Sequence, residues 1–265
     1  MNAPRRYRFY DIHSHFLPGV DDGCQTPSES IAFLKEQIHQ GCIGTIATPH
    51  YYARESIASF CARREKSFAA LKEAMVASGL GDFIPKIGVA AEVAYYRGNS
   101  ADTDITNLCY GNSDYLLLEM PFESWNPSVL REIKILQSSR GVIPVIAHIE
   151  RFFEFNSLDT IEQLINLGVL VQVNSGTFLR HGNTKKLSVQ LLRDGTMQAI
   201  GTDAHNLENR APNMKPAIEQ IISDGYEGQL IKVLQRNEEI YKAAMSEAQS
   251  DRGVKPEDSF LDFGF

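Results

Sequence analysis

Short apolar runs alternate with longer segments of helical periodicity along most of this chain. The runs are rich in β-branched and aromatic residues, and most precede a segment long enough for a helix. There are seven runs, at residues 7–12, 43–47, 83–93, 115–120, 143–149, 169–173 and 197–200. Repeated strand–helix alternation predicts parallel strands joined by right-handed crossovers. The pattern alone fits either an open doubly wound sheet or a closed α/β barrel.

The segments between these runs carry helix boundary signals. We expect helices at residues 28–40, 56–78, 128–139, 158–166 and 184–193, followed by two more at residues 214–223 and 227–248. Thr26 precedes Pro27 at the first helix, where a hydroxyl caps free amides and proline fits the first turn. No G-x-G-x-x-G follows the first strand and no P-loop sequence is present. This counts against a nucleotide-binding α/β fold.

The length favours one large domain with a short tail. A chain of 265 residues, 43% of them hydrophobic, can bury a sizeable core, and α/β barrels of this length fold as one unit. We therefore expect residues 1–249 to form a single domain. Residues 250–265 are expected to be a C-terminal tail whose final apolar hexapeptide folds back on that domain.

Charge and cysteine content argue against several classes of function. The formal net charge of -7 argues against a general binder of DNA or RNA backbones. No apolar run approaches the ~20 residues of a membrane-spanning helix, and no signal core follows the basic start. We therefore expect a cytoplasmic protein with reduced thiols. None of the four cysteines is followed six residues later by arginine, so the C-x5-R loop of cysteine-dependent phosphatases is absent.

Histidines and carboxylates collect at the carboxyl ends of the predicted strands. Five of the seven histidines and three acidic residues occupy such positions: His13, His15, His50, Glu92, Glu119, His148, Asp203 and His205. In a parallel α/β barrel the carboxyl ends of the strands meet at one mouth, so residues far apart in the chain become neighbours. Glu119 also lies in an apolar run, where an unpaired carboxylate is costly to bury. These residues are expected to form one site.

The donor atoms of this set favour a metal site. Imidazole nitrogen and carboxylate oxygen suit zinc, iron and manganese, whereas the thiolates typical of structural zinc sites are missing. His13 and His15 form an H-x-H on a strand, where alternate side chains point to the same face and can hold one ion. An isolated H-x-H is often structural. The prediction therefore depends on the coincidence of contributions from several strand ends.

Three sequence segments together resemble one known superfamily. They are DIHSHFLPGVDDG at residues 11–23, IAHIER at residues 146–151 and TDAHN at residues 202–206, with VNS at residues 173–175 also in place. The combination resembles the polymerase and histidinol phosphatase (PHP) superfamily. Within it, the chain resembles the CpsB/YwqE-type protein-tyrosine phosphatases of bacterial capsule and exopolysaccharide synthesis. The resemblance implies a distorted (β/α)7 TIM-like barrel with a metal site at the carboxyl strand ends.

The resemblance also implies a centre of three divalent metal ions. Manganese is the expected ion, with iron and zinc as alternatives. Matched residue by residue, His13, His15, Glu92 and Asp203 would hold one ion, Asp22, His50 and His205 a second, and Glu119, His148 and a bridging Glu92 the third. Asp21 stands beside Asp22, so the sequence leaves open which of the two is the ligand.

Two arginines match the phosphate-binding positions of the family. Arg151 follows His148 by three residues, and Arg210 follows His205 by five. A guanidinium fork fits phosphate oxygens and stabilises their charge in the transition state. Clustered divalent ions suit phosphomonoester hydrolysis, because they activate water, bind phosphoryl oxygens and stabilise the leaving oxygen. Either His205 or a water on a metal could protonate a tyrosyl leaving group.

Aromatic residues follow two of the strand ends. Tyr52 comes just after His50, and Phe122 and Trp125 follow Glu119. They are placed to line the entrance of the site and contact a substrate. Surface exposure or loop packing explains them equally well.

The resemblance implies a metal-dependent protein-tyrosine phosphatase. Its partner would be a bacterial tyrosine autokinase that controls capsule or exopolysaccharide synthesis. A PHP-type phosphatase of a small phosphomonoester, such as histidinol phosphate or a sugar phosphate, would use the same ligands. An amidohydrolase-like enzyme needs a bridging group between metals, which Glu92 could supply. A non-catalytic scaffold of the polysaccharide machinery would have no need of the complete ligand set.

Overall fold

Nine strands, all paired in parallel, form the centre of the part of the chain that the structure describes. This computed structural model describes residues 7–246. The strands are β1 Phe9–Ser14, β2 Cys42–Ala47, β3 His50–Tyr51, β4 Ile87–Val89, β5 Glu92–Ala94, β6 Tyr115–Glu119, β7 Ile143–Ile146, β8 Leu170–Asn174 and β9 Ala199–Gly201. They pair in the orders β1-β2-β4 and β3-β5-β6-β7-β8-β9.

Two short interruptions divide seven strand-like runs into these nine strands. Residues 48–49 separate β2 from β3, and residues 90–91 separate β4 from β5. β2 pairs with β4 from Thr45 to Ala47, and β3 pairs with β5, so the two interrupted runs lie side by side on both sides of their interruptions. Between them, the Ala90 amide donates to the Ala47 carbonyl at 2.8 Å. All seven predicted strand positions are therefore confirmed.

The first and last strands meet and close the barrel. The Asp203 amide donates to the His13 carbonyl at 2.8 Å, and the His15 amide donates to the Ala204 carbonyl at 2.9 Å. A Cβ at Gly201 would lie 2.5 Å from the Cβ of His13, so the absence of a side chain lets β9 approach β1. Of the two architectures that fit the sequence pattern, the chain adopts the barrel.

Asn237, on α7 (Glu227–Met245), links β1 and β9 at Tyr10 and Ile200, before the residues where the two strands contact directly. Its side-chain amide donates to the carbonyls of Tyr10 and Ile200, and its Oδ1 accepts from the Ile200 amide at 3.1 Å. A carboxamide offers both donors and an acceptor, as a peptide group does. This helix side chain therefore replaces backbone pairing that the two strands do not make.

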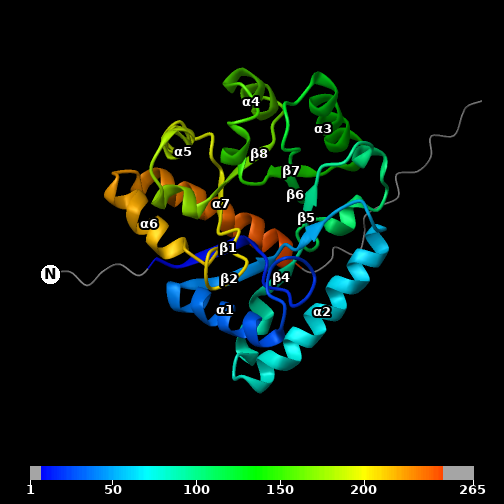
Figure 1. Cartoon of the computed structure of the whole chain (residues 1–265), viewed down its shortest axis with the longest axis vertical. Coiled ribbons are helices and arrows are strands. Elements are labelled where there is room, and N and C mark those ends of the chain that lie inside the picture. The colour runs from blue at the N-terminus through cyan, green and yellow to red at the C-terminus, as the bar shows by residue number, and fades with distance from the viewer. Residues whose placement is uncertain (1–6, 247–265) are drawn as a thin grey trace, which may run out of the picture.

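Within residues 7–246, seven α-helices surround the strands (Figure 1). They are α1 Pro27–Gln40, α2 Ile57–Ala77, α3 Pro127–Arg140, α4 Leu158–Ile165, α5 Asn183–Arg193, α6 Met214–Ser223 and α7 Glu227–Met245. In Figure 1, α1 and α2 lie on one side of the strands and α3, α4 and α5 on the other. The Thr26 hydroxyl accepts from the Glu29 amide and Pro27 opens α1, as predicted. The predicted helices agree to within one residue at each end, except that α7 ends at Met245 rather than at residue 248.

Two predicted strands are shorter than expected. The run at residues 83–93 begins inside a 3-10 helix, Gly81–Lys86, because Pro85 has no amide hydrogen to donate to a ladder. The run at residues 143–149 stops at Ile146, and a 3-10 helix, Ile149–Phe152, follows. Placing His148 within a strand was therefore wrong: it lies beyond the end of β7.

Nothing in the structure tests the predicted domain limit, since residues 250–265 lie outside the described residues. Between residues 7 and 246, we find no helix with the length and apolar character that crossing a bilayer requires.

Candidate metal centre

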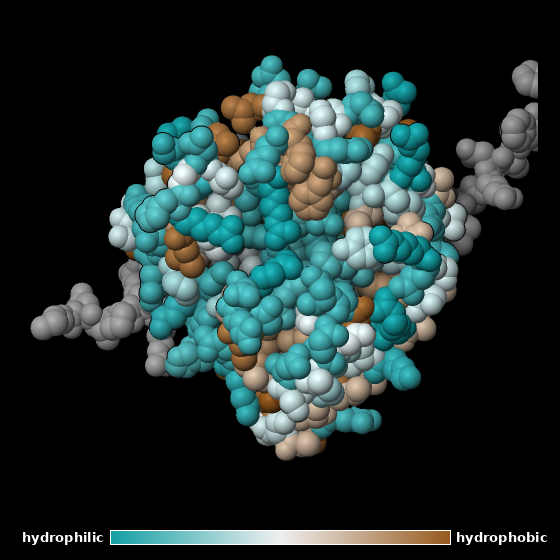
Figure 2. Space-filling model, in the orientation of Figure 1, coloured by the Kyte–Doolittle hydropathy of each residue, from teal (hydrophilic) through white to brown (hydrophobic). Residues whose placement is uncertain are grey.

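All the predicted ligands come together at one mouth of the barrel, towards the carboxyl ends of the seven strand-like runs and in the loop after β1. His13 is on β1 and His15 just beyond it, His50 opens β3, Glu92 opens β5 and Glu119 closes β6, while His148, Asp203 and His205 follow β7 and β9. Asp22 lies in the loop between β1 and α1. Hydrophilic side chains fill the middle of the face seen in Figure 2.

Glu92 lies at the centre of this cluster and is fully buried. Its Oε2 is 3.2 Å from Nε2 of His13, 3.2 Å from Nε2 of His15 and 3.1 Å from Nδ1 of His50. Its Oε1 is 2.8 Å from Nε2 of His148. Four histidines thus converge on one carboxylate.

Several of these donor atoms are buried without a hydrogen bond. Among the described residues, they are Nε2 of His13, His15 and His205, Nδ1 of His50 and Oε2 of Glu92. Buried polar atoms are normally satisfied, so a group of them facing one another needs an explanation. Ligand atoms bonded about 2.0–2.2 Å from one cation lie roughly 3–3.5 Å apart, which matches the separations seen here. The site therefore fits divalent cations.

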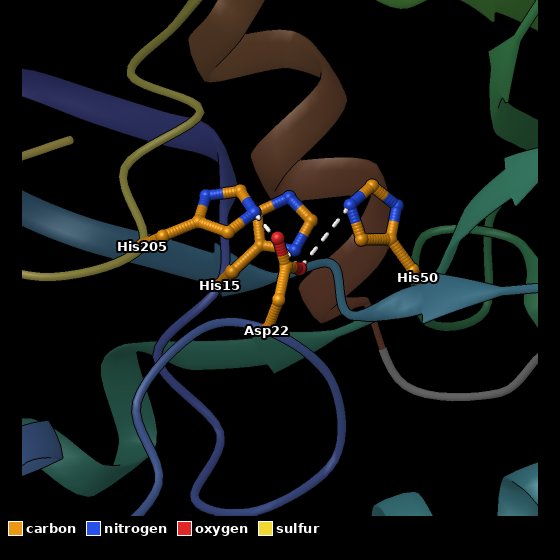
Figure 3. A group of neighbouring side chains, drawn as sticks. All are labelled: His15, Asp22, His50 and His205. Atoms are coloured by element: carbon orange, nitrogen blue, oxygen red, sulfur yellow. Dashed lines mark ion pairs between the residues drawn. The ribbon is translucent and has the colours of Figure 1, made fainter.

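The donor atoms form three overlapping groups, and within each group all donor atoms lie within 4.8 Å of one another. The groups are His13, His15, Glu92 and Asp203; His15, Asp22, His50 and His205; and His50, Glu92 and Glu119. The first is the set expected for one ion. The second contains the expected Asp22, His50 and His205 and adds His15 (Figure 3). In the third group His50 stands where His148 was expected, although Nε2 of His148 lies 3.2 Å from Oε1 of Glu119.

The neighbouring aspartates Asp21 and Asp22 differ in their contacts and in their exposure. Asp21 is bound behind the cluster, where Oδ2 lies 2.7 Å from Nδ1 of His15 and accepts from the His50 amide at 2.9 Å. Asp22 faces the opening, with Oδ1 3.3 Å from Nε2 of His205 and 3.5 Å from Nε2 of His50. The Asp21 side chain is 5% exposed and that of Asp22 63%. Asp21 therefore contacts a histidine from behind, whereas the carboxylate of Asp22 faces the candidate ligands His50 and His205 from the exposed side.

Gln172 and Asn174 support the cluster, and the sequence reasoning missed them as functional residues. Oε1 of Gln172 lies 3.1 Å from Nδ1 of His13 and accepts from the His148 amide at 2.7 Å. Asn174 donates to Oδ2 of Asp203 at 2.8 Å. The signal shared by both is polarity inside the apolar β8, because a buried amide requires partners, and Asn174 also stands in the VNS segment. Such contacts fix the orientation of candidate ligands.

His148 and Asp203 have unusual backbone conformations. Among residues 7–246, they are the non-glycine residues with positive φ, at 31° and 50°. Such conformations cost on the order of 1–3 kcal/mol and persist where the surroundings enforce them. The backbone is held in this form at two candidate ligand positions.

Arg151 and Arg210 both bind Asp203 at the edge of the cluster. Nη2 of Arg151 binds Oδ2, and Nη2 of Arg210 binds Oδ1 at 2.8 Å. Nη1 of Arg210 also lies 3.5 Å from Oδ2 of Asp22. Both arginines are partly exposed, so they combine contact with the cluster and access to solvent.

The neighbouring histidines His15 and His205 have pKa values shifted in opposite directions. Burial opposes a charged His15, but the carboxylates of Asp21 and Glu92 outweigh it and raise the His15 pKa to about 10. Burial and the nearby His15 cation lower the His205 pKa to about 3, against the attraction of Asp203. Both shifts come from the packing of charged and titratable groups around the same cluster.

A closed parallel barrel with this cluster at one mouth defines an α/β-barrel protein with a candidate metal centre. The chain belongs to the capsular polysaccharide synthesis CpsB/CapC family, whose sequence model matches residues 9–241.

Known relatives match most of the chain. CpsB of Streptococcus pneumoniae, a tyrosine-protein phosphatase, is 30% identical over 242 residues, covering 84% of this chain and 93% of the relative. The tyrosine-protein phosphatase YwqE of Bacillus subtilis is 26% identical over 240 residues, covering 87% and 90%. A solved structure from work on YwqE and CpsB as metal-dependent tyrosine phosphatases has a TM-score of 0.76 at 22% identity, covering 88% of this chain and 94% of the other. This structural likeness supports the fold.

Proposed function

We propose that this chain is a metal-dependent phosphatase that hydrolyses phosphotyrosine on a protein. The observation that carries the proposal is the group of buried, unpartnered nitrogens around Glu92 beside two partly exposed arginines. The first feature suits divalent cations and the second suits a phosphate group. The names of the relatives supply the substrate class.

We propose three divalent ions, with manganese as the expected metal. The proposed ligands are His13, His15, Glu92 and Asp203 for one ion; Asp22, His50 and His205 for another; and Glu119, His148 and Glu92 for the third. Proximity also supports a contribution of His15 to the second set and of His50 to the third. When bound, such ions activate water and stabilise the charge of phosphoryl oxygens.

Arg151 and Arg210 are the proposed phosphate-binding residues. Their shared contact with Asp203 holds both guanidinium groups at the same edge of the cluster. A phosphate there gains two planar sets of donors, and these stabilise charge that increases in the transition state.

His205 was a candidate proton donor for the leaving tyrosyl oxygen. Nδ1 of His205 lies 3.0 Å from the Asp203 carbonyl, and Nε2 lies 3.3 Å from Oδ1 of Asp22, so Nε2 is the ring nitrogen that faces the other candidate ligands. This supports a ligand role for Nε2 of His205, and we propose either His205 or a water on a metal as the donor of the leaving-group proton.

The proposed partner is a bacterial tyrosine autokinase that controls capsule or exopolysaccharide synthesis. The family's role in capsular polysaccharide synthesis supports this choice. The cytoplasm is the proposed compartment, and the four free cysteines agree with a reducing environment. The acidic composition favours a protein partner over nucleic acid.

Phosphate release tests the proposal. Protein stripped with EDTA is reloaded separately with manganese, iron or zinc and given a phosphotyrosyl peptide, histidinol phosphate or a sugar phosphate. We expect that adding metal restores phosphate release, and that release from the phosphotyrosyl peptide is faster than from the two small phosphates. Preference for a small phosphate would reassign the substrate, and inactivity with every metal would favour a scaffold.

A further inference from the structure

Aromatic rings flank the metal centre at two neighbouring strand ends. Tyr52 follows β3, and its ring stacks on that of His50 with centroids 5.4 Å apart. Phe122 follows β6, and its ring stacks on that of His148 with centroids 6.2 Å apart. Because both histidines contact Glu92, the two aromatic rings border the same part of the cluster.

Phe122 is half exposed although the loop that carries it is held firmly. The Trp125 indole donates to the Pro121 carbonyl at 2.9 Å, and the Trp125 amide donates to Oδ1 of Asn156 at 2.8 Å. Phe152, fully buried, packs against Phe122 with ring centroids 5.1 Å apart. Nevertheless 48% of Phe122 faces solvent. The ring therefore has a fixed support and a free apolar surface.

Tyr52 is built in a similar way. Its neighbour Tyr51 is buried and donates its hydroxyl to the Glu55 carbonyl at 3.1 Å, which anchors the segment. The Arg54 guanidinium lies 5.7 Å from the Tyr52 ring centroid. Tyr52 itself is 45% exposed. In Figure 2, apolar side chains border the hydrophilic middle of this face.

We propose that Tyr52 and Phe122 contact the phenyl ring of the substrate and make the site selective for aryl phosphates. This inference rests on the proposed phosphatase function. In phosphotyrosine the ring is bonded directly to the ester oxygen, so a phosphate held by Arg151 and Arg210 keeps the ring close to the ligand cluster. Aromatic rings attract one another in stacked and edge-on arrangements. Phosphoserine and small alkyl phosphates offer no ring for these contacts.

Steady-state kinetics with matched substrates tests the inference. Tyr52→Ala and Phe122→Ala should each raise KM for a phosphotyrosyl peptide roughly three- to tenfold, with a smaller change in kcat. KM for the phosphoseryl version of the peptide and for glycerol phosphate should stay the same. Tyr52→Phe should keep the parent KM, because the ring remains. Val76→Ala, an exposed position at the end of α2, is the control for loss of apolar surface.

Binding without turnover gives a second measurement. A peptide containing non-hydrolysable phosphonomethyl-phenylalanine should lose the same three- to tenfold in calorimetric affinity on the two alanine variants. Metal content, measured by mass spectrometry, should be unchanged. Equal losses on aryl and alkyl substrates, or loss of bound metal, would assign both rings to support of the histidines and overturn the inference. Inactivity of the metal-loaded parent protein on phosphotyrosine would instead overturn the proposed function.

Discussion

The floor and the rim of the metal centre are built in different ways. We define the floor as His13, His15, Glu92 and His148, and the rim as Asp22, Tyr52, Phe122, Arg151 and Arg210. The floor is fully buried and lies on strands or immediately after them. The rim lies on loops and a 3-10 helix, and its side chains are partly exposed.

The difference concerns what holds each side chain in place. The floor histidines His13 and His15 are fixed from behind by hydrogen bonds that Gln172 and Asp21 accept. Rim arginines are fixed by Asp203, which itself belongs to the candidate ligand set. A buried, preorganised floor suits metal binding, since ligand positions need little adjustment. A rim of partly exposed groups suits substrate selection, because it can exchange water for substrate.

Removing a floor histidine should have the largest effect. His148→Ala should lower phosphatase activity by roughly 10³-fold or more and reduce bound metal, because an aligned donor beside Glu92 and Glu119 is lost. Phosphate release and metal content measure both effects. His148→Asn is a useful companion, since asparagine tolerates the positive φ better than alanine. A folded variant with normal activity would remove His148 from the metal site.

Removing a rim arginine should reduce activity and leave the metal in place. Arg151→Ala and Arg210→Ala should each lower kcat/KM by about 10²-fold, because phosphate loses a charged donor pair. Metal content should stay at the parent value. Arg193→Ala provides the control, since Arg193 is exposed at the end of α5 and pairs with Asp194. Loss of metal from either rim variant would break the division between floor and rim.

The sequence predicted the floor better than the layer behind it. Strand ends are marked by apolar runs, so the sequence pattern alone places the histidines that follow them at a barrel mouth. The contact of Asp21 with His15 depends on how the loop after β1 turns back. The sequence contains no periodic signal for that turn, so it does not decide between Asp21 and Asp22.

Interruptions in the strands were also beyond the sequence pattern. A continuous apolar run predicted one strand at residues 83–93, yet this strand is interrupted at Ala90 and Ala91, which lie between β4 and β5 in the chain. Arg64, buried on α2, donates to the Ala90 carbonyl at 3.0 Å and satisfies it there. This contact joins positions 26 residues apart. Local composition cannot reveal such a partner, and the exact end of a strand depends on it.

Gln172 tests whether the floor depends on its supporting layer. Gln172→Ala should weaken metal affinity by roughly 10–100-fold, because the ring of His13 loses the partner that orients it. Titration of stripped protein with manganese measures the change. Gln198→Ala is the matched control, since Gln198 makes a comparable amide contact with Val171 before β9 begins. Equal affinity in both variants would show that the strands alone position the floor.

Thermal unfolding gives the smallest expected effect and compares the two regions in one measurement. A ligand at about 100 times its Kd stabilises the folded state by about 2.7 kcal/mol, which corresponds to a Tm increase of roughly 5–10 °C for a chain of this size. The parent protein and Arg210→Ala should both show this increase with manganese, because their buried donors are intact. His148→Ala should show much less of it. If Arg210→Ala also lost the response, Asp203 would depend on its arginine partner to bind metal, and floor and rim would act as one unit.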